Sequence, residues 1–290
     1  MILEIGRLLT MTQNNNIRKW GKLAYRFLIT FGILVILYPF GSQTYYQFIN
    51  RQEVNQFDQQ KKQIESADIQ ERIDLARAYN RTLTPEKLGD PFTQEEKKGV
   101  AEYARMLQLQ EKIGYVSIPS IDQEITIRAG TSEDVLQSNA GHLEGTSLPV
   151  GGKGTHTVIT AHRGLPSARL FTDLDKLKIG DVFYITNLKE TLAYKVDQIL
   201  VVPPDNFDPV LVTENKDYAT LLTCTPYMVN SHRLLVRGTR VPLPKEFSTD
   251  IKKIDFFSQY RWYIILISIS LVLLLGYIVY RLLKRRRKSS

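Results

Sequence analysis

Residues 219–240 (ATLLTCTPYMVNSHRLLVRGTR) contain two apolar runs separated by a short polar loop. Both runs carry β-branched and leucine residues, and the loop carries Pro226 and Asn230, so the pattern predicts two antiparallel strands joined by a loop. The only cysteine, Cys224, ends the first run, and Arg233 opens the second. Because neighbouring strands lie roughly 4.8 Å apart, the thiol and the guanidinium are expected to share a site at one end of a sheet.

From residue 114 onward, short apolar stretches alternate with turns rich in Gly, Pro and Asn. Further strands are predicted at residues 115–118, 124–128, 155–161, 181–186 and 192–202. Short strands at this spacing are typical of an all-β barrel or sandwich. Residues 131–141 and 168–176 are expected to form short surface helices. The sequence therefore predicts a mostly β fold.

Two apolar segments near the ends of the chain predict membrane segments. Residues 262–280 carry no charge and are bounded by aromatic residues, and a spanning helix needs roughly 20 apolar residues. A buried core helix is the alternative, but such helices rarely stay apolar on every side over this length. Residues 27–40 follow a basic region and form either a signal peptide or an uncleaved anchor. No small-residue cleavage site follows them, which favours the anchor.

The net charge of +8 would suit a nucleic-acid partner, but its distribution argues against one. Residues 1–40 carry a net +4 and residues 281–290 a net +6, which leaves −2 for the rest. Basic flanks stay in the cytoplasm, so the central part is expected on the extracytoplasmic side of the cell membrane. One cysteine there excludes an internal disulfide framework, and a lone exported thiol favours a chemical role.

These features divide the chain into eight segments. They are a cytoplasmic N-terminus (1–22), a signal-anchor or signal peptide (23–42), a helical stalk (43–83), a loop (84–95), a β-barrel domain (96–245), a juxtamembrane linker (246–261), a transmembrane helix (262–281) and a basic cytoplasmic tail (282–290). Apolar residues at helical spacing predict two stalk helices, broken near residues 66–68. Thr93 and Glu96 match a capping box, which predicts a helix reaching about residue 110.

His162 is the histidine best placed to act with Cys224. It follows the predicted strand TVITA and opens a loop, as Cys224 does at the end of its own strand. Cysteine reacts as the thiolate, and a nearby imidazole can generate the thiolate or protonate a leaving amine. The guanidinium of Arg233 would stabilise a tetrahedral intermediate. No aspartate or asparagine is clearly placed to orient the histidine, and spacing alone leaves a structural role equally open.

Other residues are weaker candidates for this site. Arg163 and Arg237 are rivals to Arg233, although Arg237 lies four positions along the same strand, roughly 13 Å away. His232 is expected on the opposite face of that strand and is interpreted as structural.

No metal or cofactor site is expected. His142 and His156 lack acidic or cysteine companions at the spacing of metal ligands. Gly151, Gly152 and Gly154 lack the lysine–serine pattern of a phosphate-binding loop and are interpreted as a turn.

TLLTCTPY followed by NSHRLLVRG resembles the signature of the sortases, and TAHRG resembles their histidine motif. The runs AGHLEGTSLPVGG, HRGLPSARLFTDLDKL and SHRLLVRGTR resemble class C sortases, the pilus-assembling branch. The resemblance covers roughly residues 114–240, and it implies a sortase-type β-barrel. It also implies Cys224 as nucleophile, His162 as acid/base, and Arg233 as the oxyanion-stabilising or substrate-positioning residue. Met228 departs from the family, which commonly has Gly after Pro-Tyr, and this puts the shape of the loop in doubt.

The resemblance further implies a lid within residues 84–95. Class C sortases carry an Asp-Pro-aromatic triplet there, and this chain has Asp90, Pro91 and Phe92. The implied contacts are the Asp90 carboxylate with the catalytic arginine and the Phe92 ring over the cysteine, with Pro91 stiffening the turn. From the residues alone, an ordinary Gly-Asp-Pro turn before a capped helix is the alternative.

By this resemblance the chain is a membrane-anchored cysteine transpeptidase. It would cleave an LPXTG-like sorting signal on a pilin precursor through a thioacyl intermediate and join it to a lysine of the next pilin by an isopeptide bond. The alternatives are a housekeeping sortase that anchors proteins to cell-wall peptide, a hydrolytic cysteine protease, and a non-enzymatic membrane-tethered adhesin or scaffold.

Overall fold

The computed structural model describes residues 2–83, 102–109 and 111–244 of the 290-residue chain. The chain divides into two compact units, Met1–Leu243 and Pro244–Ser290. The first unit contains, in order, α1 (Ile2–Lys61), α2 (Ser66–Arg81), η2 (Glu102–Leu107), β1 (Lys112–Ile118), η3 (Pro119–Ile121), β2 (Gln123–Ala129), α3 (Glu133–Leu136), β3 (Ala140–His142), β4 (Thr155–Thr160), η4 (Leu174–Lys176), β5 (Val182–Thr186), β6 (Thr191–Val202), η5 (Asp208–Val210), β7 (Asp217–Thr225) and β8 (His232–Val241).

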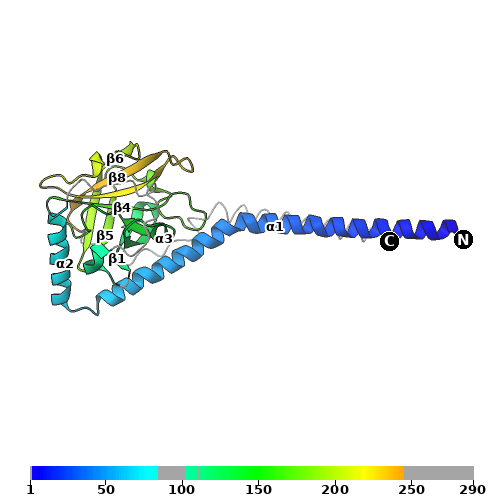
Figure 1. Ribbon diagram of the computed structural model, residues 1–290, viewed down its shortest axis with the longest axis horizontal. Coiled ribbons are helices and arrows are strands. Elements are labelled where there is room, and N and C mark those ends of the chain that lie inside the picture. The colour runs from blue at the N-terminus through cyan, green and yellow to red at the C-terminus, as the bar shows by residue number, and fades with distance from the viewer. Residues whose placement is uncertain (1, 84–101, 110, 245–290) are drawn as a thin grey trace. The chain divides into compact units, whose positions relative to one another are not determined.

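The eight strands close into a barrel in the order β1-β2-β3-β4-β7-β8-β6-β5 (Figure 1). Most neighbours are antiparallel, but β2 runs parallel to β3 and β4 runs parallel to β7. The β4–β7 pair bears on the site, because the C-terminal ends of its two strands lie at the same rim of the barrel. The antiparallel partner of β7 is β8, so the first residues of β8 lie at that rim as well. The ends of β4 and β7 and the start of β8 thus meet at one place, although β4 is distant from the other two in sequence.

Both faces of the barrel wall are buried at this rim. Along β7, Ala219 and Leu221 belong to the cluster that fills the barrel, whereas Leu222 belongs to a second cluster on the outer face. The outer cluster is covered by the β6–β7 connection, through Phe207 and Val210. Burial on both faces agrees with the absence of charged residues from β7 after Asp217.

The predicted β-barrel is confirmed, and two of the predicted short helices are wrong in part. Within residues 131–141 only Glu133–Leu136 is helical, and Ala140–His142 forms β3 between β2 and β4. A Cβ on Gly141 would lie 2.4 Å from the carbonyl oxygen of Gly130, so glycine at this position permits the two backbones to approach closely. A strand of three residues is too short to show the alternation of apolar and polar residues from which strands are predicted. Within residues 168–176 only the short 3₁₀ helix Leu174–Lys176 forms.

The helical stalk is confirmed in outline. α1 ends at Lys61 and α2 begins at Ser66, so the chain breaks close to the predicted position. α1 continues through Pro39 towards the N-terminus. By length and composition, one stretch within Leu23–Lys61 could cross a membrane, and its side chains are not buried. The helix predicted from Thr93 to residue 110 is described only in part, as the 3₁₀ helix Glu102–Leu107.

The C-terminal part of α1 packs against the barrel through an apolar contact. Phe57 is fully buried, and its ring meets the ring of Tyr115 on β1 edge-on, with 6.1 Å between the centroids. Val54, one turn earlier, is buried in the same cluster. The apolar residues that recur at helical spacing in this part of α1 therefore form the surface that packs against the barrel.

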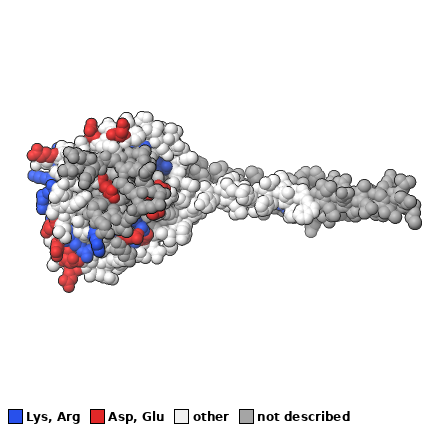
Figure 2. Space-filling view, in the orientation of Figure 1, with Lys and Arg blue, Asp and Glu red and all other residues white. Residues whose placement is uncertain are grey.

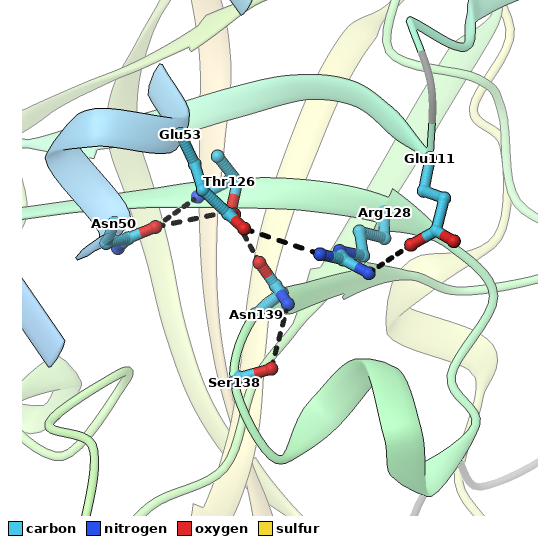
Figure 3. Close-up of polar contacts among 7 residues, drawn as sticks. All are labelled: Asn50, Glu53, Glu111, Thr126, Arg128, Ser138 and Asn139. Atoms are coloured by element: carbon cyan, nitrogen blue, oxygen red, sulfur yellow. Dashed lines mark hydrogen bonds and ion pairs between the residues drawn. The ribbon is translucent and has the colours of Figure 1, made fainter. Parts of the chain in front are cut away.

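A polar contact accompanies the apolar one (Figure 3). The side-chain oxygen of Asn50 accepts hydrogen bonds from the backbone nitrogen of Thr126 at 3.3 Å and from its hydroxyl at 3.2 Å. Glu53 pairs with Arg128 at 3.5 Å, and Arg128 also pairs with Glu111. Asn50 and Glu53 are thus paired with β2 across the helix–strand boundary, which fixes the register of α1 on β2.

Charged side chains of both signs are interspersed over the face of the barrel drawn in Figure 2, whereas the described stretch of α1 is mostly uncharged. This distribution agrees with the near-neutral charge of the central part of the sequence.

Several predicted segments lie outside the described residues. They are the loop at 84–95 with Asp90 and Phe92, the linker at 246–261, the transmembrane helix at 262–281 and the tail at 282–290.

Candidate active site

Cys224 and Arg233 face each other across the β7–β8 pair. The register of the two strands makes them direct partners, as the hairpin pattern predicts. Directly opposed residues have Cβ atoms about 4.5–5.5 Å apart. Cys224 is 5% exposed and Arg233 is 4% exposed. A thiol and a permanent cation are therefore held side by side, at the end of β7 and the start of β8.

The pair lies on the outer face of the barrel wall. Side chains alternate between the two faces of a strand, so Cys224 shares a face with Leu222, two residues earlier. Arg233 likewise shares a face with Leu235. Both leucines belong to the outer cluster, whereas Leu234 belongs to the cluster that fills the barrel. The site therefore lies on the outside of the wall, next to an apolar surface.

His162 reaches the same face from β4. The parallel register pairs Thr160 with Leu222, and beyond it the nitrogen of Ala161 donates to the carbonyl of Leu222 at 3.2 Å. The hydroxyl of Thr223 donates to the carbonyl of Ala161 at 2.7 Å. His162 follows Ala161 as Cys224 follows Thr223, so the two residues lie level on adjacent segments. Ile159 and Ala161 belong to the inner cluster. Side chains alternate between the two faces, so the next residue, His162, points to the outer face.

The backbone of the β7–β8 loop holds the Arg233 side chain. Its Nη1 donates to the carbonyl oxygens of Asn230 and His232, each at 3.0 Å. These bonds orient the planar guanidinium, whose position then depends on the shape of the loop.

Comparison with known proteins agrees with this geometry. A model of the sortase domain matches residues 116–241. The crystal structure of Streptococcus pneumoniae Sortase C, whose description concerns catalysis and pilin substrate specificity, is 58% identical; the match covers 66% of this chain and 97% of that one, with a TM-score of 0.62. A pilus-related Sortase C of Group B Streptococcus is also 58% identical, over 64% of this chain and 95% of that one, with a TM-score of 0.62.

The chain belongs to the sortase family. Sortase A of Bacillus anthracis is a more distant relative, 28% identical over 186 residues, which are 64% of this chain and 83% of that protein. The solved structures of higher identity are sortases C, so the chain is a class C sortase. It is accordingly a cysteine transpeptidase.

The sortase fold brings an acidic residue to His162 that the sequence did not indicate. The Oε2 atom of Glu133, the first residue of α3, lies 3.6 Å from Nε2 of His162. The two side chains are 56% and 21% exposed, so the interaction is an ion pair when the imidazole is protonated, partly screened by water. No spacing rule connects residues 29 positions apart in different elements, and only the placement of α3 reveals the contact.

Arg163 is engaged away from the outer face. Its guanidinium pairs with Asp175 at 2.6 Å and donates to the hydroxyl of Thr225 at 3.0 Å and to the carbonyl of Thr172 at 3.2 Å. Its bond to Thr225 lies on the face of β7 opposite to Cys224.

Arg237 is engaged further along β8. It makes a two-pronged ion pair with Asp197, at 3.0 and 3.2 Å, and stacks over the ring of Tyr218 at 4.3 Å. Among the three arginines considered from the sequence, the strand register pairs only Arg233 with Cys224.

The β7–β8 loop adopts a conformation that suits glycine, although its sequence has none. Met228 has φ of +66° and Asn230 has φ of +59°, both in the left-handed region. The nitrogens of Val229 and Asn230 donate to the carbonyl of Pro226, which closes the turn. The substitution of Gly by Met thus occurs at a position with a left-handed backbone. Tyr227, Met228 and Val229 are exposed on this loop.

The other three histidines lie outside the site. His142 is fully buried, and its Nε2 is 2.8 Å from the carbonyl of Ser147. His156 contacts the carbonyl of Leu211 at 3.0 Å and the hydroxyl of Thr220 at 2.7 Å. Burial lowers the pKa of each of these two imidazoles to about 4. His232 is exposed and contacts the hydroxyl of the preceding serine.

Within the described ranges, no group of three or more His, Cys, Asp and Glu side chains is arranged to hold a metal ion. The segment with Gly151 and Gly152 forms a turn, in which the nitrogen of Gly152 donates to the carboxylate of Asp217 at 2.9 Å.

Proposed function

We propose that this class C sortase polymerises pilins. The supporting observation is the strand register that sets Cys224 against Arg233, with His162 level with them on the same outer face. Sortases C of similar sequence are described as pilus-related or in terms of pilin substrate specificity. The substrate would be a pilin precursor with a C-terminal LPXTG-like sorting signal, and the acceptor a lysine of the next pilin.

Cys224 would act as the nucleophile on the threonine carbonyl of the sorting signal. As the thiolate sulfur bonds to the carbonyl carbon, negative charge develops on the carbonyl oxygen. The guanidinium of Arg233 lies next to the thiol and would donate hydrogen bonds to that oxygen. His162 would protonate the leaving amine of the glycine, which releases the C-terminal fragment and leaves a thioester on Cys224.

The second half of the reaction reverses these roles with a different amine. The acceptor lysine would enter as the neutral amine, and His162 would take a proton from its nitrogen as that nitrogen attacks the thioester. Collapse of the second tetrahedral intermediate forms the isopeptide bond and expels the thiolate of Cys224. Water is the competing nucleophile, and a covered site limits hydrolysis.

Asp90 and Phe92 are proposed as a lid over this site. A 5% exposed thiol has to be uncovered before a peptide carbonyl can reach it. The carboxylate of Asp90 is chemically suited to Arg233, and the ring of Phe92 to covering Cys224.

The membrane segments are proposed to hold the enzyme beside membrane-retained substrates. The apolar stretch within Leu23–Lys61 and the segment at 262–281 would both anchor the chain, with the barrel on the extracytoplasmic side.

The test is incubation of the enzyme with a candidate pilin precursor, followed by denaturing electrophoresis. We expect ladders of covalent polymers that are absent with Cys224→Ala, and a Cys224 acyl adduct by mass spectrometry. Single products linked to cell-wall peptide would indicate a housekeeping sortase, and released peptide without an amine requirement would indicate a protease. An unreactive Cys224 that gives neither adduct nor product would favour the scaffold.

A further inference from the structure

The residues that directly follow His162 and Cys224 contact each other. Arg163 Nη1 donates a hydrogen bond to Oγ1 of Thr225 at 3.0 Å. Thr225 directly follows Cys224 in β7, and side chains alternate along a strand, so this contact lies on the face of β7 opposite to the thiol. The two segments that carry the proposed acid/base and nucleophile are therefore joined by a contact that does not use the face of β7 on which the thiol lies.

The guanidinium of Arg163 uses each of its three nitrogens in this role. Besides the bond to Thr225, Nε donates to the carbonyl of Thr172 at 3.2 Å, and Nη2 pairs with Asp175 at 2.6 Å. The side chain of Arg163 is 7% exposed, whereas that of Asp175 is 49% exposed, so the guanidinium is buried and its carboxylate partner is in contact with water. A rigid planar fork with three partners fixes direction as well as distance, which a lysine ammonium does not.

The loops beyond the strands also pack together at this point. Gly164 has φ of +90°, and a Cβ there would lie 3.1 Å from the ring of Tyr227. The same ring lies 5.9 Å from the guanidinium carbon of Arg163. The loop after β4 thus approaches the β7–β8 loop closely, on the side where Arg163 lies.

These contacts matter because the regular pairing of β4 with β7 stops before the reactive residues. The last registered pair is Thr160 with Leu222, two positions before His162 and Cys224. Beyond that pair, one backbone bond, from the nitrogen of Ala161 to the carbonyl of Leu222, continues the pairing, and side-chain bonds such as that from Thr223 to the carbonyl of Ala161 join the two segments further.

We propose that Arg163 is a positioning residue of the sortase reaction, which sets the separation of His162 and Cys224 by binding Thr225, Thr172 and Asp175. This proposal rests on the proposed function, because it assumes that these two residues react. Arg163 itself does not touch the substrate. Arg163 affects the distance and angle at which the thiol and the imidazole meet the carbonyl in the tetrahedral step. It does not form part of the outer, peptide-binding face.

The test compares Arg163→Lys and Arg163→Gln with the wild-type full chain in detergent. We expect the rate constant of acylation by a sorting peptide to fall about 10- to 100-fold in both, because displacement of reacting groups by about 1 Å costs that much. KM should change little, since the peptide-binding face is intact. Arg163→Lys keeps the positive charge but loses the planar guanidinium with its donors in fixed directions. A reduced rate in this variant would therefore show that the geometry of the side chain, and not its charge alone, is required.

Arg169→Lys is the matched control. Arg169 lies in the same segment and pairs with Asp173, without a contact to β7 among the described residues. We expect its acylation rate to stay at the wild-type level. Circular dichroism and thermal unfolding check that each variant is folded at the assay temperature.

Thr225→Val removes the acceptor and leaves Arg163 in place. If the two residues act as one unit, the rate of Arg163→Lys/Thr225→Val falls no further than that of the more severe single variant. Wild-type acylation rates in folded Arg163→Lys, or multiplying effects in the double variant, would overturn the positioning role while the function stands. A wild-type enzyme that forms no Cys224 adduct would instead remove the proposed function, and this inference with it.

Discussion

At the scale of the residue, the position of Cys224 differs from that of an inert buried cysteine. It is 5% exposed, but the residues that share its face belong to the outer cluster and not to the filling of the barrel. A thiol on the outer face is reached by moving a covering segment, whereas a thiol inside a closed barrel is reached only by unfolding. Its neighbour Arg233 is oriented by two loop carbonyls, so the site combines a nucleophile with a preorganised cation.

Glu133 gives a prediction at the same scale. Glu133→Gln should lower kcat by a factor of about 1.4 to 5 at low salt, because a partly exposed ion pair contributes about 0.2–1 kcal/mol to the charged imidazole. The difference from wild type should shrink as salt screens the pair. Steady-state cleavage of a sorting peptide at several salt concentrations measures it.

Asp134→Asn is the control for Glu133, since Asp134 is the next acid on α3. It should leave kcat unchanged at every salt concentration. Equal kcat for wild type and Glu133→Gln at low salt would exclude the ion pair from the reaction.

At the scale of the element, the site is assembled from the ends of β4 and β7 and the start of β8. None of these three segments is unusual by itself. What makes them a site is that β4 and β7 run parallel, so that two C-terminal ends meet, while β8 returns antiparallel beside them. The α1 helix contributes separately, by packing Phe57 against β1.

The loop at 84–95 gives the first prediction at this scale. Replacing both Asp90 and Phe92 by Ala should speed labelling of Cys224 by a thiol reagent and cleavage of a sorting peptide, each about tenfold or more. The reason is that a hydrogen bond to a charged group contributes about 1.5–3 kcal/mol, which a lid must give up to open. Lys87→Ala, in the same loop, is the control. Unchanged rates in both assays would discard the lid.

The docking of α1 gives the second prediction. Phe57 is fully buried, whereas Phe48 on the same helix is 65% exposed. Phe57→Ala should lower the free energy of unfolding by about 3–5 kcal/mol, because it leaves a cavity between α1 and the barrel. Phe48→Ala should change it by about 0.5 kcal/mol or less. Urea unfolding followed by far-ultraviolet circular dichroism measures both, and equal values would contradict the docking of α1 through Phe57.

At the scale of the whole molecule, a closed barrel protects its strand edges and lets side chains be buried on both faces of the wall. Two of the buried side chains are ionisable imidazoles. Burial lowers the pKa of His142 and of His156 to about 4, so both are neutral in the folded protein. The unfolded chain takes up these protons below a pH of about 6.5.

This difference predicts loss of stability in acid. Above a pH of about 6.5 both imidazoles are neutral in the folded and the unfolded chain, and the free energy of unfolding is at its full value. As the pH falls from about 6.5 towards 4, each imidazole lowers the free energy of unfolding by about 3 kcal/mol. Glu124 opposes the trend: burial raises its pKa to about 7, so it favours the folded state as the pH falls from 7 to about 4.5. Urea unfolding between pH 7.5 and 4.5 measures the net slope.

His156→Gln should flatten this slope, and His232→Gln, at an exposed site, should leave it unchanged. If His156→Gln and wild type lose stability equally between pH 6.5 and 4.5, the buried imidazole does not contribute to it.

The sequence by itself determined a mostly β fold, the two-helix stalk and the pairing of Cys224 with Arg233, because apolar periodicity and turn residues act between near neighbours in the chain. Periodicity left a barrel and a sandwich equally open, and the barrel followed from the resemblance to sortases. Only the tertiary structure decided that the site lies on the outer face of the wall, that Glu133 approaches His162, and that Arg163 binds Thr225. It also decided that Ala140–His142 is a strand, since that segment gains its hydrogen bonds from β2 and β4. The physical reason is that these contacts join residues distant in the chain, and only closure of the barrel brings them together.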